Sequence, residues 1–424
     1  MRTSVSPTED ETLLTANTPR AFWGVLDEGI ETDDWRTASE HARHCLAGLP
    51  VADDGGDPVK VMEQALGEGQ FGPRHWQLSR PKRLYYALRP VLPEGIRPLL
   101  RRAFLTRQRT GVALDWPVED RYVRYQFELM RQALMVAQRA SVPAIHFWPQ
   151  GKQFAFVLTH DVESQRGHDF VRELVALEEK YGFRSAFNFV PQCYQVDSRL
   201  RGELRERGFE VGVHGLKHDG KLYASYATFC DRAQRINDYL QEWQAIGFRS
   251  PMTHRHPMWM QALNVEYDSS FFDTDPFEPI PGGTMSIWPY TLGRFIELPY
   301  TLSQDHTLMV TLAERSPKLW LEKVAFIAQH SGLALLNAHP DYLLVPKHLA
   351  IYESFLQQMQ SLSGYWHALP RNVARWWRWR ASVKTTEDVG EASALTVPQP
   401  TVGYLTLTQD ASLMFCDSPS LTPA

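Results

Sequence analysis

The segment Phe154-Ala-Phe-Val-Leu-Thr-His-Asp-Val-Glu163 decides the fold class of this chain. Its first six residues are almost all apolar, as is typical of a strand that is buried on both faces. Polar residues follow at once, so the strand is predicted to end in a group of functional side chains. Because successive side chains of a strand alternate, Asp161 and Glu163 are expected on one side and His160 and Val162 on the other.

Strands and helices alternate downstream of this segment. Apolar runs predict strands, and apolar residues at helical spacing predict helices between them. This rhythm predicts an α/β fold with a mainly parallel sheet, open or closed into a barrel, and chemistry at the carboxyl ends of the strands. Further strands are expected over 185–190, 210–214 and 333–339, and helices over 169–182, 199–208 and 226–243.

Composition limits the class of protein. The 424 residues carry 44 Lys and Arg against 49 Asp and Glu, and 43% are hydrophobic. These values favour a globular protein over a disordered one and argue against a nucleic-acid partner. No apolar run approaches the roughly 20 residues of a membrane helix, and no signal peptide is recognised. A cytoplasmic location is therefore expected, with membrane-peripheral contact through the Trp- and Arg-rich segment 375–380 as an alternative to packing of that segment on the barrel.

The domain organisation follows from changes in composition. Residues 1–20 and 381–424 are rich in Thr, Ser and Pro, and both are predicted to be disordered. Residues 21–150 are predicted to form a mainly helical region, and 151–380 the α/β domain. No Gly- or Ser-rich tether separates the two, so the helical region is expected to pack on the barrel.

Two carboxylates follow the first strand. Asp161 and Glu163 share one side of the chain, and such a pair can divide the work between metal ligand and general base. The alternative is structural, with the two acids serving as a helix cap and a surface charge.

Two histidines follow the strand at 210–214. His214 and His218 stand four residues apart, so a helical turn would bring them to one face. Together with a carboxylate from another strand they fit a zinc-type site with open positions. The alternative is that they are core or surface histidines.

Two further strand ends carry candidates. His339 could act as a general acid, with Asp341 nearby to tune or orient it. Arg249 could hold a carboxylate through its fixed fork of donors. In the alternative reading both His339 and Arg249 are structural.

These four pieces resemble, in their order along the chain, the motifs of the NodB-homology polysaccharide deacetylases, a carbohydrate esterase family. The first family motif, Thr-Phe-Asp-Asp-Gly, looks like Thr159-His-Asp-Val-Glu163. The second, His-Ser/Thr-x-x-His, matches His214 and His218, the third looks like Arg249-Ser-Pro251, and the last is similar to Leu336-Asn-Ala-His339. The resemblance covers residues 150–345. It implies a distorted (β/α) barrel of about seven strands and a divalent metal, usually zinc.

The resemblance also implies residue roles. The first Asp of the family is the base, which is Asp161 here, and the two histidines bind the metal. Val162 replaces the adjacent metal-binding Asp, and Glu163 is its best substitute. Gly215 stands where the family has Ser or Thr, and Thr253 where it has Gly.

The remaining expectations concern the substrate. His339 is expected to protonate the leaving group, while Arg249 and Asp341 are expected to bind substrate. The usual reaction of the family removes an N- or O-acetyl group from a sugar, so an acetylated, nucleotide-linked or lipid-linked glycan is the expected partner. The alternative, motivated by the missing Asp-Asp pair, is a catalytically inactive relative that binds a glycan or an assembly partner.

Overall fold

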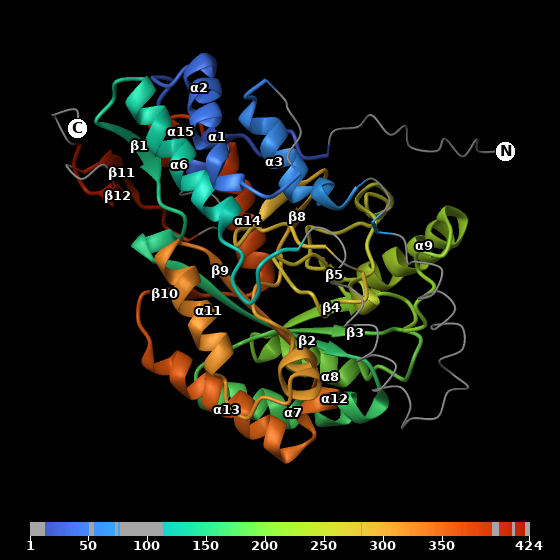
Figure 1. Ribbon diagram of the computed structural model, residues 1–424. Coiled ribbons are helices and arrows are strands. Elements are labelled where there is room, and N and C mark those ends of the chain that lie inside the picture. Colours follow the sequence, from blue (N-terminus) through green and yellow to red (C-terminus); the bar gives the residue numbers. More distant parts are fainter. Residues whose placement is uncertain are drawn as a thin grey trace.

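A computed structural model gives the arrangement of the chain (Figure 1). A curled sheet runs through the molecule, with helices along its outer side and a second group of helices over one end. The structure describes residues 13–50, 55–72, 75–76, 113–280, 282–391, 398–408 and 412–419.

Seven parallel strands close into a distorted barrel. From β2 to β8 each barrel strand pairs with the next, and β9 pairs with β2. One isolated parallel bridge, Leu302–Leu336, joins the segment after β8 to β9, and a second, Phe272–Tyr300, joins the segments that follow β6 and β8. The predicted barrel of about seven strands is therefore confirmed. In order around the barrel the strands are β2 (Phe154–Val162), β3 (Ala186–Phe189), β4 (Glu210–His214), β5 (Gly247–Arg249), β6 (Tyr267–Asp268), β8 (Phe295–Glu297) and β9 (Leu333–Ala338).

Two more strands extend the sheet. β10 (Tyr365–His367) pairs with the first residues of β2, whereas β3 pairs with its last residues. β7 (Tyr290–Leu292) runs antiparallel to β8. The all-buried pattern of β2 agrees with its apolar sequence, because a parallel strand with helices outside and a filled barrel inside meets water on neither face.

Helices cover the outside of the barrel, and serine or aspartate side chains cap several of them. Ser164 accepts a hydrogen bond from the backbone of Gly167, and Asp197 and Ser225 cap the next two helices in the same way. The predicted helices are confirmed, although all three end one or two residues earlier than expected and the first two also begin earlier. The helices are α7 (Gln165–Lys180), α8 (Ser198–Glu206), α9 (Tyr226–Glu242), α10 (Pro257–Met260), α11 (Lys318–Gln329), α12 (Pro340–Leu343) and α13 (Pro346–Ser361), with 3-10 turns at η4 (Pro149–Gly151) and η5 (Pro251–Thr253) and a π-helical turn at η6 (His306–Thr311).

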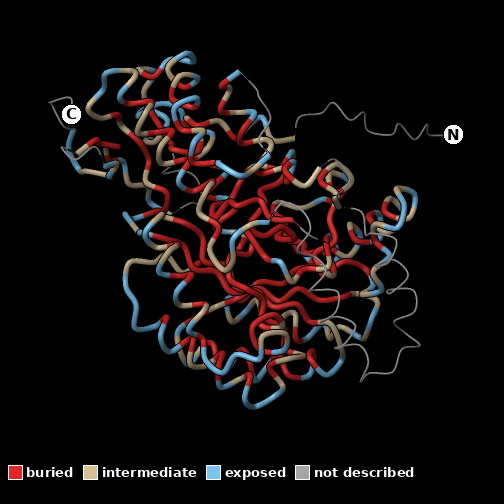
Figure 2. Tube along the Cα trace, in the orientation of Figure 1, coloured by how far each residue is buried: buried red, intermediate tan, exposed pale blue. Residues whose placement is uncertain are grey.

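The N-terminal region packs against the barrel through a shared core. Buried residues run from the barrel into these helices in one cluster (Figure 2). Phe22 contacts Trp288 at a ring distance of 4.9 Å, and Phe147 stacks on Trp377 at 6.3 Å. The elements are α1 (Pro19–Trp23), α2 (Thr32–Ala42), η1 (Arg43–Leu46), α3 (Pro58–Leu66), η2 (Gly69–Phe71), α6 (Arg121–Val136) and β1 (Ser141–Ile145), while α14 (Pro370–Ser382) packs on them from the other end of the chain.

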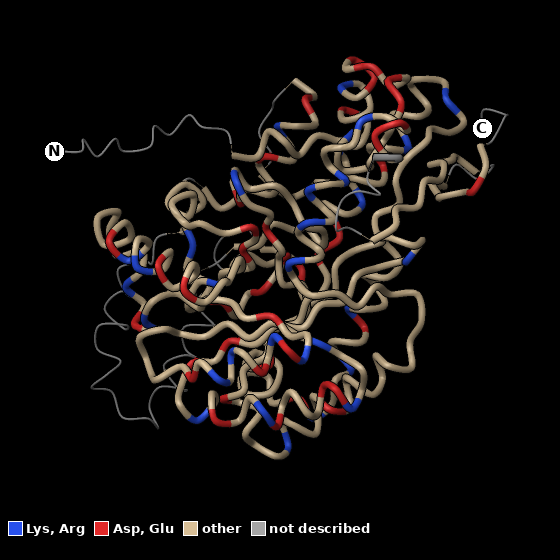
Figure 3. Tube along the Cα trace, turned by 180° about the vertical axis from the view of Figure 1, so that it is seen from behind, with Lys and Arg blue, Asp and Glu red and all other residues tan. Residues whose placement is uncertain are grey.

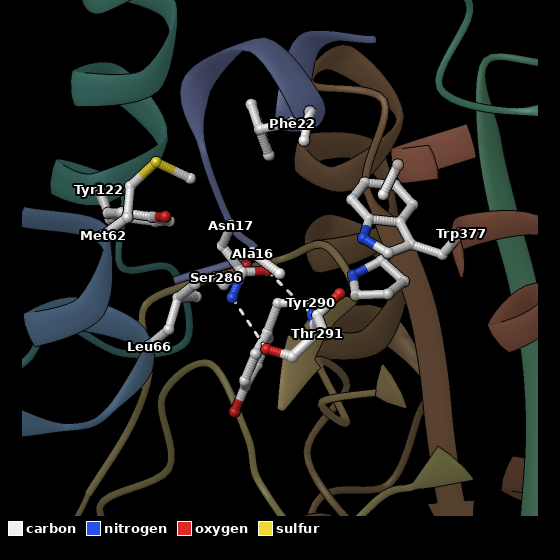
Figure 4. Close-up of a pocket in the computed structure, with 13 residues that line it drawn as sticks. Ala16, Asn17, Phe22, Met62, Leu66, Tyr122, Ser286, Tyr290, Thr291 and Trp377 are labelled. Carbon is white, nitrogen blue, oxygen red and sulfur yellow. Dashed lines mark hydrogen bonds between the residues drawn. The ribbon is translucent and has the colours of Figure 1, made fainter. Parts of the chain in front are cut away.

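A small pocket lies where this region meets the barrel (Figure 4). Asn17 lies beside the edge of β7, where its side chain donates to the carbonyl of Thr291 at 2.8 Å and accepts from the amide of Thr291 at 2.9 Å. The side-chain amide thus satisfies backbone groups that an open sheet edge would expose.

The two predicted disordered ends require correction. β11 (Val402–Leu407) and β12 (Leu413–Cys416) form a three-stranded antiparallel sheet with β1, and α15 (Thr386–Glu391) precedes them. Leu405 and Leu407 are buried there, so alternating apolar residues offset the ordering cost that the polar composition suggested. Residues 13–20 also hold defined positions, and residues 1–12 lie outside the described part of the chain.

Acidic and basic residues are interspersed over the described chain (Figure 3). Trp376 and Trp377 on α14 are buried, so the tryptophans of this segment pack inward, whereas Arg375 and Arg378 are exposed. Among the described residues, no helix combines the length and the apolar composition that spanning a bilayer needs.

Candidate active site

A carboxylate and two imidazoles meet at the carboxyl end of the barrel. Glu163 follows β2, His214 ends β4, and His218 lies in the loop after β4. One possible ligand atom from each residue lies within 4.8 Å of the others. His218 Nε2 is 2.9 Å from Glu163 Oε1. This is the trio that the sequence predicts as metal ligands.

The orientation and protonation of the His214 ring suit the binding of a cation. Its Nδ1 lies 3.0 Å from the carbonyl oxygen of Arg249, so Nδ1 carries the proton and Nε2 presents a lone pair. Nε2 is buried and has no hydrogen-bond partner among the described residues. Burial lowers the pKa of His214 to about 4, which keeps the ring neutral. A neutral imidazole oriented by a backbone carbonyl is the usual form of a metal-binding histidine, so the residues fit a divalent metal.

Asp161 lies beside this trio and is held as an anion. Asn188 Nδ2 donates to Oδ1 at 3.1 Å, and Asn337 Nδ2 donates to Oδ2 at 2.9 Å. Arg249 Nη1 is 3.6 Å from Oδ1. Burial by itself would raise the pKa, but the positive groups around the carboxylate, Arg249 and His339 among them, outweigh it and lower the pKa of Asp161 to about 2.

His339 faces both carboxylates from β9. Its Nε2 is 4.0 Å from Asp161 Oδ2 and 3.7 Å from Glu163 Oε1. Its Nδ1 donates to Asp305 at 2.7 Å, and Asp305 also accepts from the backbone amide of His339 at 2.8 Å. Burial opposes the charged ring, but Asp305 dominates together with the other carboxylates and raises the pKa of His339 to about 10. His339 is therefore a proton donor at neutral pH.

The predicted alternation of side chains along β2 holds. His160 points away from Asp161, since its Nε2 lies 2.6 Å from Glu178 on α7 and its ring stacks on Phe187. Val162 is completely buried. Asp161 and Glu163 therefore share the side of β2 that faces His339, as the sequence indicates.

Arg249 and Asp341, which were expected to bind substrate, instead contact other residues of the protein. Arg249 is completely buried, with Nη1 donating to Thr159 at 2.8 Å, so it lies beneath Asp161. Asp341 does not orient His339, and that expectation was wrong. It accepts from the backbone amide of Glu163 at 3.0 Å and from the hydroxyl of Ser164, which fixes the turn after β2.

Sequence reasoning missed three residues that hold the site. Asn337 stands two residues before His339, and a polar residue at that spacing on an apolar strand was a usable signal. Asn188 is likewise polar within the apolar strand β3. Asp305 follows a segment without periodicity, so nothing local connected it to His339.

The comparisons with known proteins give no sequence relative. No family model matches the chain, and no curated protein matches it.

Solved structures do match, at low identity. A protein from Mycobacterium smegmatis assigned as a polysaccharide deacetylase is 20% identical, with a TM-score of 0.45 over 55% of this chain and 92% of that chain. A Pseudomonas aeruginosa PAO1 protein of the same assignment is 17% identical, with a TM-score of 0.45 over 55% of this chain and 94% of that chain. Puue allantoinase is 16% identical, with a TM-score of 0.44 over 57% of this chain and 95% of that chain. The chain is thus similar to two proteins assigned as polysaccharide deacetylases, the family that its motifs resemble, and to an allantoinase.

Proposed function

We propose that this protein is a metal-dependent hydrolase that removes an N- or O-acetyl group from a sugar or a glycan precursor. The observation that carries the proposal is the meeting of two sets of side chains. The trio Glu163, His214 and His218 lies beside an anionic Asp161 and a protonated His339. A base, an acid and a cation site within one barrel mouth are the groups that acyl hydrolysis needs.

Glu163, His214 and His218 would hold the metal, and zinc suits a donor set of two imidazoles and one carboxylate. When bound, the metal supplies a Lewis acid that polarises the acyl carbonyl. Glu163 takes the place of the family's second aspartate, and its extra methylene compensates for its position one residue later.

Asp161 and His339 would move the protons. Asp161 accepts a proton from the attacking water, because its carboxylate is ionised and held by two amide donors. His339 gives a proton to the leaving nitrogen or oxygen, and Asp305 keeps Nε2 of its ring toward the site. Arg249 holds Asp161 in place and does not contact substrate.

Metal content tests the cation site. The purified chain, reconstituted with zinc and desalted, is expected to keep about one zinc per molecule. His214→Ala and His218→Ala each lose it while circular dichroism stays unchanged, and the exposed His41→Ala keeps it. Equal zinc in all four proteins contradicts the ligand assignment.

Turnover separates the two carboxylates. On N-acetylated and O-acetylated oligosaccharides, Asp161→Asn is expected to keep zinc but lose about 100-fold or more in kcat, because the amide cannot accept the proton. Glu163→Ala is expected to lose zinc. The reverse pattern exchanges the roles, and bound zinc without release of acetate from any glycan favours the inactive glycan-binding alternative.

A further inference from the structure

A hydrogen-bonded chain leads from Asp161 to a second carboxylate, Glu278, which the roles above do not use. Asn337 Nδ2 donates to Asp161 Oδ2 at 2.9 Å and to Gln304 Oε1 at 3.4 Å. Gln304 Nε2 in turn donates to Glu278 Oε1 at 2.5 Å. Two amide side chains therefore connect two carboxylates.

Glu278 is fixed by other donors as well. The hydroxyl of Tyr300 donates to Oε1 at 2.7 Å, and the hydroxyl of Thr253 donates to Oε2 at 2.6 Å. Three donors from two segments, the η5 turn and residues 300–304, thus define the place of one carboxylate. Thr253 is also the residue that replaces the glycine of the third family motif.

The direction of the chain follows from the chemistry of its ends. An ionised carboxylate only accepts hydrogen bonds, whereas an amide donates from one end and accepts at the other. Glu278 Oε1 accepts from the NH₂ group of Gln304, and this turns the oxygen of Gln304 toward Asn337. Asn337 must then present its own NH₂ group, whose second hydrogen goes to Asp161.

Burial makes this orientation of the two amide groups, Gln304 and Asn337, obligatory. Water cannot replace a missing donor where the polar atoms are shielded, so each reversal would leave a buried group unsatisfied. The exposed fractions are 2% for Asp161, 1% for Asn337, 9% for Gln304 and 6% for Glu278.

We propose that Glu278 is a positioning residue for Asp161 and acts through Gln304 and Asn337. Without Glu278, Gln304 is free to reverse its amide, and the reversed amide pushes the oxygen of Asn337 toward the carboxylate of Asp161. This inference rests on the proposed function, in which Asp161 is the base.

Two substitutions at one position separate polarity from volume. Glu278→Gln preserves the direction, because its amide oxygen can accept from Gln304 and Tyr300 while its NH₂ group donates to the hydroxyl of Thr253. Glu278→Met has a similar length but no acceptor.

Kinetics on an acetylated oligosaccharide gives the first readout. Glu278→Met is expected to lower kcat about tenfold or more, as for loss of an oriented hydrogen bond to a charged group, with KM and zinc content unchanged. Glu278→Gln is expected to recover kcat to within about threefold of the original chain. A raised KM with unchanged kcat assigns Glu278 to substrate contact and overturns the proposal.

Crystal structures of the two variants give a readout that needs no activity. In Glu278→Met the Asn337 amide is expected to leave Asp161, and in Glu278→Gln it is expected to remain. If Asn337 keeps its contact in the methionine variant, the positioning role is wrong whatever the activity. If the contact breaks but the original chain hydrolyses no acetylated glycan, the positioning role stands and the proposed function fails. Gln304→Met interrupts the same chain at its centre and replaces Glu278→Met if that variant does not fold.

Discussion

At the scale of single residues, the site depends on partners that orient each functional group. Nδ1 of His214 is bound to a carbonyl and Nδ1 of His339 to Asp305, so both rings present Nε2 to the barrel mouth. The difference in partner sets the difference in role, because a carbonyl leaves the ring neutral and a buried carboxylate favours the charged ring.

Substitution of Asp305 tests whether His339 is a general acid. Asp305→Ala removes the charge that raises the pKa of His339 and releases the ring from its orientation. We expect a loss of about 100-fold in kcat/KM on an N-acetyl sugar, whose amine must be protonated as it leaves. On p-nitrophenyl acetate, whose leaving group needs no proton, the loss is expected to stay within about threefold. Equal losses on both substrates would assign Asp305 a structural role only.

At the scale of elements, strand β4 carries a buried acid, Glu210, at its start and a candidate metal ligand, His214, at its end. Glu210 is almost completely buried and accepts from the hydroxyl of Tyr267 at 3.0 Å and from the amide of Arg371 at 3.2 Å. Burial dominates over these contacts and raises the pKa of Glu210 to about 7. The free energy of unfolding therefore depends on the protonation of Glu210, at the opposite end of β4 from His214.

The pH dependence of unfolding tests this term. Between the ordinary carboxyl pKa of 4.5 and about 7, the folded chain holds a proton that the unfolded chain has released. Stability from this group is thus full below pH 4.5 and is lost as pH rises through 7, by up to about 3 kcal/mol. Glu210→Gln is expected to lose less stability than the original chain between pH 5 and pH 8 in urea unfolding. Identical pH changes in the two proteins would exclude Glu210 as the source.

At the scale of the whole molecule, the N-terminal region and the barrel share polar as well as apolar contacts. The side chain of Arg380 is buried and donates to the carbonyls of Phe22 at 2.7 Å and Ile145 at 3.0 Å. Glu68 forms a buried ion pair with Arg255 of the barrel. A barrel without these helices would leave such groups unpaired.

Limited proteolysis tests this dependence. Because the contacts are buried, we expect trypsin to release no stable fragment that begins near Gly151, and residues 151–424 produced alone are expected to aggregate. Unfolding of the full chain is expected to show one transition by fluorescence and by circular dichroism. A soluble fragment from 151 with a cooperative unfolding transition would show that the barrel folds alone.

From the sequence, the pattern of strands and helices predicted a mainly parallel sheet and most of the site at its edge, and the motif resemblance implied that the sheet closes into a barrel. Apolar strands that end in Asp161, His214 and His339 were sufficient, because parallel strands bring their carboxyl ends to one rim wherever they lie in the chain. Alternation along β2 then assigned Asp161 and Glu163 to one side.

Only the tertiary structure decided which residues hold that site and where the chain ends belong. Asp305 and Glu278 lie in segments without periodicity, so no local pattern connects them to His339 or Asp161. The strands of the C-terminal segment exist because β11 pairs with β1, from Ser141–Thr406 to Ile145–Val402. Pairing across such separations depends on the position of the folded partner, and local composition does not contain that information.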